Sequence, residues 1–151
     1  MRQSRRSSVS ICLALLAMTA AACGGGRDRD PGATGTSGTT AAVRVTDVTL
    51  GRSVGGDKAI AERADTFQPN DTIYASVATD GSANNATLRA RWTFEDGQVV
   101  DESTKTIAPS NRERTEFHIS KPDGWPAGKY KLEVFLDNRS VETKDFEVRG
   151  R

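Results

Sequence analysis

The stretch that decides the fold is WPAGKYKLEV, residues 125–134. Its second half alternates, with Tyr130, Leu132 and Val134 on one side and charged residues on the other, which is the pattern of a half-buried β-strand. Its first half is a turn, because a residue before proline favours extended geometry and glycine permits a tight bend. A tyrosine that opens a strand after such a turn can tie the strand to the turn through its hydroxyl group.

The two-residue period extends through residues 43–148. In residues 87–94 the apolar side chains alternate with polar ones, and a turn at 95–98 leads to a returning strand, 98–106, polar enough for a sheet edge. Five further strands are predicted at 43–50, 71–79, 114–120, 129–136 and 141–148. The first has a phase shift between Val45 and Val48, and the last is expected to contain a bulge near Lys144-Asp145. Residues 51–66 are the least regular part of the pattern, and residues 57–65 within them fit either one or two helical turns or an irregular strand anchored by Ile60 and Phe67. About seven strands separated by turns predict an all-β, antiparallel β-sandwich of immunoglobulin-like type.

Three parts of this pattern carry a family resemblance. Residues 125–134 with 146–148 resemble the C-terminal half of immunoglobulin-like domains in bacterial envelope proteins, and residues 67–74 and 88–92 extend the likeness. Over most of residues 43–148 the chain resembles small bacterial envelope lipoproteins built on one such domain. The resemblance implies a fold and no catalytic residue.

The N-terminus predicts export. Residues 1–6 are basic, residues 9–17 form a short apolar run, and small residues lead to Cys23. This order is that of a signal peptide, and the apolar run is shorter than the roughly 20 residues of a membrane-spanning helix. A cysteine at the cleavage point resembles a bacterial lipoprotein signal. The resemblance implies cleavage after Ala22 and attachment of acyl chains, such as palmitate, to Cys23. An ordinary signal peptide with an incidental cysteine is the alternative.

The predicted organisation is a cleaved signal at 1–22, the lipidated Cys23 with a flexible Gly/Ser/Thr linker at 23–42, and one domain at 43–151. The expected location is the cell envelope, with the protein held on a membrane through Cys23. Gly24 stands where Asp would mark inner-membrane retention in Gram-negative lipoproteins. In a Gram-negative cell we therefore expect the outer membrane, facing the periplasm.

Composition argues against several partners. The signal contains Arg2, Arg5, Arg6 and no acid, so the mature chain keeps 18 of the 21 basic residues against 20 acidic ones, a formal charge near −2. Such a balance gives no electrostatic footprint for nucleic acid. Cys12 is lost with the signal and Cys23 is acylated, so we expect no disulfide partner.

The sequence gives little support for a catalytic function. His118 is the only histidine, and it lies on the outward face of a predicted strand with no second histidine or cysteine to complete a metal set. No serine stands in a Gly-x-Ser-x-Gly turn. Asp and Asn residues at 80–85 and 137–138 suit turns better than a calcium loop. We expect no catalytic residue, no metal and no cofactor.

Four residues are candidates for binding: Trp125, Tyr74, Arg89 and Arg91. Trp92 is assigned to the core, whereas Trp125 either plugs one end of the domain or binds a partner. Arg89 and Arg91 either form a recognition face or only keep the sheet soluble. The favoured function is a non-enzymatic protein-interaction or structural module that contacts another envelope protein. The alternative is glycan or peptidoglycan binding through outward aromatics, namely Tyr74, Trp125 and Phe135.

Overall fold

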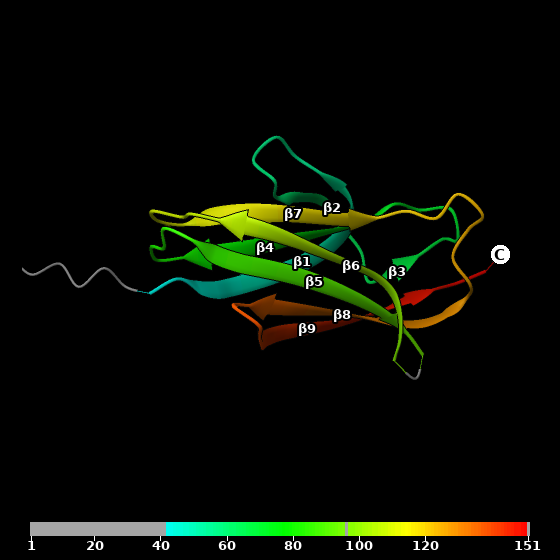
Figure 1. Ribbon diagram of the computed structural model, residues 1–151. Coiled ribbons are helices and arrows are strands. Elements are labelled where there is room, and N and C mark those ends of the chain that lie inside the picture. The colour runs from blue at the N-terminus through cyan, green and yellow to red at the C-terminus, as the bar shows by residue number, and fades with distance from the viewer. Residues whose placement is uncertain (1–41, 96, 151) are drawn as a thin grey trace, which may run out of the picture. The chain divides into compact units, whose positions relative to one another are not determined.

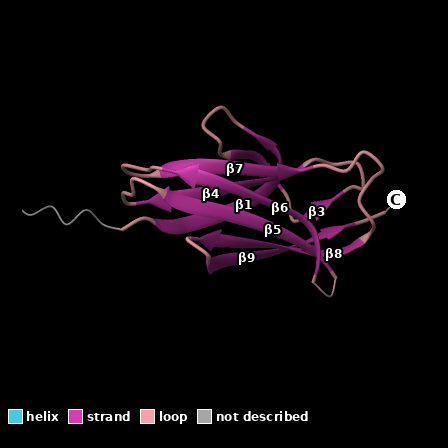
Figure 2. Cartoon of the chain, in the orientation of Figure 1, coloured by secondary structure: helices cyan, strands magenta, loops and turns pink. Residues whose placement is uncertain are grey.

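The computed structural model describes residues 42–95 and 97–150, so the expectations for the signal, for Cys23 and for most of the linker lie outside the described residues. The described chain is built from strands joined by turns and loops (Figures 1 and 2). The strands are β1 (Arg44–Val54), β2 (Ile60–Arg63), β3 (Thr66–Phe67), β4 (Ile73–Asp80), β5 (Ala86–Phe94), β6 (Gln98–Ile107), β7 (Glu113–Ile119), β8 (Gly128–Leu136) and β9 (Arg139–Val148).

Two sheets form a sandwich, which confirms the all-β prediction. A four-stranded sheet has the order β2-β1-β4-β7, and a five-stranded sheet has the order β3-β9-β8-β5-β6. All neighbouring strands are antiparallel except β3 and β9, which pair in parallel. The strand β6 lies at a sheet edge, as its polar sequence predicts.

The core follows from the alternation within the strands. In β5 the side chains of Leu88, Ala90 and Trp92 are fully buried, while the residues between them are partly exposed. Trp92 packs edge-on against Phe146 with ring centroids 5.8 Å apart, so the prediction that Trp92 belongs to the core is confirmed. The strand β4 is buried on both faces over most of its length, because the β1–β2 hairpin folds over it and Ser76 Oγ donates to the carbonyl of Lys58 at 2.6 Å.

The segment 51–66 is not helical, so the helical option is wrong. It forms the rest of β1, the short strand β2 and the two-residue strand β3, which raises the strand count from the predicted seven to nine. Gly51 makes the close pairing of β1 with β2 possible, since a Cβ there would lie 2.2 Å from Ile60 Cγ2. Lys58 adopts a positive φ of 62° in the turn between them. Such short strands leave no two-residue period to detect in the sequence.

Bulges explain the phase shifts within strands. In β1 the pairing shifts between Val45 and Asp47, as predicted. In β9 the extra residue is Val141, so the predicted position near Lys144-Asp145 is wrong. The turn at 137–138 fixes the pairing of Leu136 with Arg139, and regular pairing from Glu142 onward leaves only Val141 to absorb the shift. The Val141 side chain is consequently 41% exposed.

The two ends of the sandwich have different roles. The described chain begins at Ala42, which forms a bridge with Ser82 at one end, together with the turn at 137–138 (Figure 1). The opposite end, called here the distal end, carries the β5–β6 hairpin, the loop 120–127 and the last described residues. The nine residues of β5 run between the two ends, a distance of about 30 Å at roughly 3.3 Å per residue.

Candidate functional site

The distal end is fixed first by Tyr130. Its hydroxyl group donates to the carbonyl of Pro126 at 2.8 Å, which confirms the predicted tie between strand and turn. Its ring stacks on Phe146, with centroids 5.3 Å apart, and also packs on Phe94 at 4.8 Å. Burial raises the pKa of the Tyr130 phenol, because the phenolate would lose its hydration. Gly128 lets the chain pass close to Phe94, since a Cβ there would lie 2.6 Å from the ring.

Hydrogen bonds hold both the backbone and the side chain of Trp125. Its backbone N–H donates to the carbonyl of Pro69 at 2.7 Å, and its indole Nε1–H donates to the carbonyl of Asp71 at 3.2 Å. The ring meets Tyr130 edge-on, with centroids 6.2 Å apart. The residue is 6% exposed, which agrees with the option that Trp125 plugs one end of the domain and not with the outward position that the glycan-binding alternative requires. Trp125 closes the distal end of the core and, with its remaining surface, lines a pocket.

A charged cluster supports the loop that receives Trp125. Arg52 Nε lies 3.0 Å from Asp71 Oδ2, and the same carboxylate accepts the backbone N–H of Gln68 at 2.8 Å. The Arg52 guanidinium also donates to the carbonyl of Thr66 and lies over the ring of Phe67. The hydrogen bond to Asp71 raises the pKa of Arg52, despite the opposing effect of desolvation. These contacts join β1, β3 and the loop before β4.

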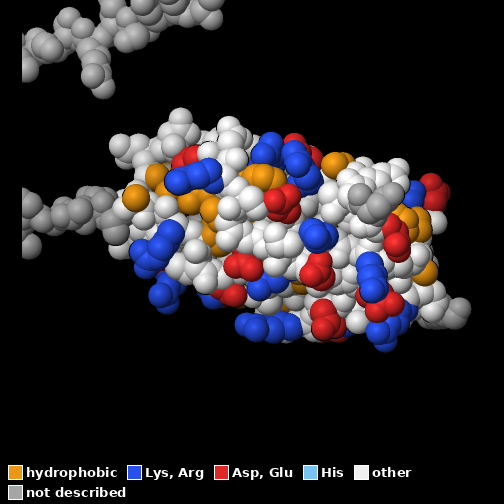
Figure 3. Space-filling model, turned by 90° about the horizontal axis from the view of Figure 1, so that it is seen from below, with side chains coloured by type: hydrophobic (Ala, Val, Ile, Leu, Met, Phe, Trp, Pro, Cys, Tyr) orange, Lys and Arg blue, Asp and Glu red, His pale blue; other side chains and the backbone are white. Residues whose placement is uncertain are grey.

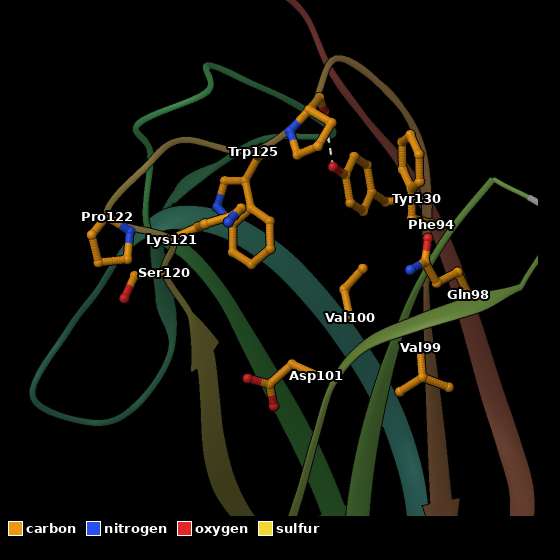
Figure 4. A pocket seen from close by; sticks show the side chains of 11 residues that line it. Phe94, Gln98, Val99, Val100, Asp101, Ser120, Lys121, Pro122, Trp125 and Tyr130 are labelled. Atoms are coloured by element: carbon orange, nitrogen blue, oxygen red, sulfur yellow. Dashed lines mark hydrogen bonds between the residues drawn. The ribbon is translucent and has the colours of Figure 1, made fainter.

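The distal pocket lies between the start of β6 and the loop 120–127, with a volume of about 480 Å³ (Figure 4). One wall comes from β6 and the other from the loop, while Phe94, Trp125 and Tyr130 contribute aromatic surface between them. Its residues are Phe94, Gln98, Val99, Val100, Asp101, Ser120, Lys121, Pro122, Trp125, Pro126 and Tyr130. Within the described ranges, Asp101 and Lys121 make no ion pair.

Exposed apolar side chains gather at this pocket. Among the described residues, three large hydrophobic side chains are exposed: Val99 at 53%, Val141 at 41% and Val100 at 36%. Val99 and Val100 line the distal pocket, and Val100 is the bulged residue of β6. Exposed apolar groups beside an aromatic-lined hollow are a feature of protein interaction sites.

The pocket opens onto an unpaired seam between the sheets. Within the described chain, β6 pairs only with β5, and β7 pairs only with β4, so each is an outer strand. Lys105 of β6 crosses the seam, where its Nζ donates to the carbonyl of Glu116 at 2.5 Å and lies 5.2 Å from the centre of the Phe117 ring. The contact of Lys105 with Glu116 therefore closes the seam near the end of β6 and leaves open the part toward the distal end.

Arg89 and Arg91 lie together on the outer face of the five-stranded sheet. Their guanidinium carbons lie 4.2 Å and 5.2 Å from the centre of the Phe135 ring, and both pair with Glu102. The hydrogen bond from Arg91 lowers the pKa of Glu102. Phe135 lies on this outer face, as expected, but the two arginines cover its ring and leave it only 8% exposed, so it is not available as an exposed aromatic. Figure 3 shows one face of the domain, on which basic and acidic side chains are interspersed.

Tyr74 lies on the outer face of the other sheet, away from the arginines. It is half-buried beside His118, with ring centroids 5.5 Å apart, and His118 Nδ1 lies 2.6 Å from Glu116 Oε1. The four sequence candidates are thus spread over three places, and only Trp125 lies at the distal pocket. Sequence reasoning missed Val99, Val100, Asp101 and Lys121, although two adjacent valines in a polar edge strand were a visible signal.

The described residues lack two kinds of feature. No group of three or more His, Cys, Asp or Glu side chains there is placed to hold a metal ion. No helix in the same residues has the length and apolar character needed to cross a membrane.

Comparison with solved structures shows the fold. An immunoglobulin-like protein of Pseudomonas aeruginosa matches with a TM-score of 0.50 and 19% identity, covering 74% of this chain and all of that one. A CARDB domain of a Pyrococcus furiosus protein matches 70% of this chain at 13% identity and a TM-score of 0.40, covering 88% of that chain. The DNA glycosylase AlkC of Pseudomonas fluorescens matches 71% of this chain at 12% identity and a TM-score of 0.47, covering 30% of that chain. No family model and no curated protein matches the sequence. The fold is immunoglobulin-like.

Proposed function

We propose that this chain is a lipoprotein, anchored through Cys23, whose immunoglobulin-like domain binds another envelope protein at the distal pocket without catalysing a reaction. The observation that carries the proposal is the pair Val99 and Val100, exposed at the rim of an aromatic-lined pocket. Burial of such side chains by a partner is favourable at about 25 cal/mol per Å² of apolar surface.

The position of the pocket suits a tethered module. The domain is entered at Ala42, and the pocket lies at the far end of the strands. The Gly/Ser/Thr linker predicted from the sequence, about 19 residues, would span roughly 25 Å on average as a flexible chain. The pocket lies at the end of the domain opposite Ala42, about 30 Å along the strands. A partner located away from the anchoring membrane fits this arrangement.

The aromatic side chains favour a protein partner over a glycan. Sugar rings stack on the exposed flat faces of aromatic residues, yet Trp125 and Phe135 are 6% and 8% exposed. Tyr74 is half-buried against His118, on a different face from the pocket. The pocket instead combines aliphatic, aromatic and proline side chains with a few polar groups, which is the composition of a protein interface core surrounded by a polar rim.

Photo-crosslinking in living cells tests the proposal. A photoreactive amino acid replaces Val99 in the full chain, and the matched control carries it at Val141, the exposed valine outside the distal pocket. We expect one discrete adduct with a membrane or envelope protein at position 99 and at least fivefold less at position 141. Equal adducts at both positions, or none at position 99, would contradict a protein site at the distal pocket.

A further inference from the structure

The open part of the β6 edge has the features of a strand acceptor. Residues 98–103 of β6 pair with β5 on one side only, and their other side faces the seam beside the distal pocket. Unpaired backbone groups of an edge strand can bind an extended segment, with affinity from main-chain hydrogen bonds and selectivity from side-chain pockets. Beyond residue 103, the crossing of Lys105 to Glu116 blocks the seam. An added strand is thereby limited to about six residues.

The side chains that an added strand would meet are set by the register of β6. Asp101 and Ser103 lie opposite Trp92 and Ala90, whose side chains are fully buried, so both face the inner side of the sheet. Figure 4 shows Val100 and Asp101 leaving β6 beside the pocket. Asp101 is exposed and makes no ion pair with the described residues. An inward charge at an edge opposes pairing with most strands.

A basic side chain directly opposite Asp101 removes this obstacle, because opposite charges in cross-strand pairs are stabilising. The next residue on the same face of the added strand is two positions away, owing to the alternation of side chains. In the direction away from Ser103, that residue reaches the pocket formed with Trp125 and Val100. The occupant therefore needs a basic residue and a large apolar residue separated by one position.

We infer that the distal seam binds an extended peptide segment of a partner, added as a strand to β6, with a basic residue at Asp101 and an apolar side chain in the distal pocket. This inference rests on the proposed protein-binding function and specifies the chemistry of the partner. The rest of the molecule offers no comparable combination in the described residues: the hollow beside Asp145 and Arg149 is lined mainly by charged groups.

Two synthetic peptides, STKTFTS and STETFTS with blocked termini, test the inference against ¹⁵N-labelled full chain purified in detergent. We expect STKTFTS to shift the backbone amide signals of residues 98–103 and the indole N–H of Trp125, with an affinity at least threefold higher than that of STETFTS. Asp101→Lys is expected to reverse this preference. Glu113→Lys, which changes an exposed acid at the other end of the edge strands, is the matched control for Asp101→Lys and should preserve the preference for STKTFTS.

A second pair of variants tests the pocket. Val100→Ser is expected to weaken STKTFTS binding at least threefold, whereas Val141→Ser should leave it unchanged, since both valines are bulged, exposed residues and only Val100 lines the pocket. The inference would be overturned if the chain bound STKTFTS and STETFTS equally well, or if Asp101→Lys still preferred STKTFTS. Amide shifts centred outside residues 98–103 would overturn it as well. Concentration-dependent shifts of residues 98–103 without peptide would also overturn it, by assigning the seam to a second copy of the chain. An adduct at Val99 in cells together with any of these results would leave the proposed function standing.

Discussion

At the scale of single residues, Tyr130 decides how the distal end is held. Its hydroxyl donates to Pro126, and its ring packs between aromatic neighbours. Because burial raises the pKa of Tyr130, the unfolded chain loses the phenolic proton before the folded one does. The stabilisation is complete below the unfolded pKa of about 10 and is lost as pH rises from there through the raised folded pKa.

The Tyr130→Phe variant tests this linkage. Removal of the hydroxyl should lower the free energy of unfolding near pH 8 by about 1 kcal/mol, the typical net value of one hydrogen bond. Between pH 8 and 11 the wild-type stability should fall more steeply than that of Tyr130→Phe, as measured by urea denaturation. Tyr74→Phe, which also removes a phenol but on the outer face of the other sheet, is the matched control. A Tyr130→Phe profile as steep as that of the wild type would show that Tyr130 is not responsible.

The sequence was most informative for residues whose role depends on near neighbours. Tyr130 and Pro126 are four positions apart, and the turn chemistry between them was enough to predict their hydrogen bond. Trp125 was ambiguous, because its partners Pro69 and Asp71 lie more than 50 positions away. Phe135 looked exposed from alternation alone, yet Arg89 and Arg91 on the neighbouring strand cover its ring. The exposure of such side chains depends on contacts between distant segments, and these contacts cannot be read from a single sequence.

At the scale of elements, the pairing of β1 with β2 depends on the missing side chain of Gly51. A Cβ there would lie 2.1 Å from the carbonyl oxygen of Glu62 and 2.2 Å from Ile60 Cγ2. Gly51→Ala should therefore displace β2 and cost about 1 to 3 kcal/mol of unfolding free energy, as overpacking commonly does. Gly56→Ala, in the same hairpin with no atom within 4 Å of its Cβ position, is the matched control. Thermal unfolding of both variants measures the difference, and equal melting temperatures would contradict the pairing.

Long strands were predictable and short ones were not. The seven long strands have enough residues for alternation to show, and all seven are present. The strands β2 and β3 span four and two residues, and they exist because β1 and β9 offer them partners. The bulge of β9 was expected, but its position depends on the turn at 137–138, which sets the register of the hairpin.

At the scale of the whole molecule, the anchor and the domain are predicted to be separable. Cys23→Ser in the full chain should abolish lipid attachment and move the protein from the membrane fraction to the soluble fraction, because acyl chains supply the membrane affinity. The domain should still fold, since its core is formed by described residues from Val48 to Val148. Fractionation of cells, with circular dichroism of the released protein, measures both. A serine variant that sediments with membranes as the wild type does would rule out Cys23 as the anchor.

The place where the described chain finishes has a practical consequence. Gly150 lies beside the loop 120–127, since a Cβ on it would approach Ala127 to 3.9 Å. An affinity tag or fluorescent protein fused after this residue would emerge next to the distal pocket and obstruct access to it. The hairpin tip at Gly55-Gly56 is exposed and belongs to the other sheet, on the far side of the core from β8 and β9. Reporter insertions for imaging or purification belong at that tip, where they leave the distal pocket uncovered.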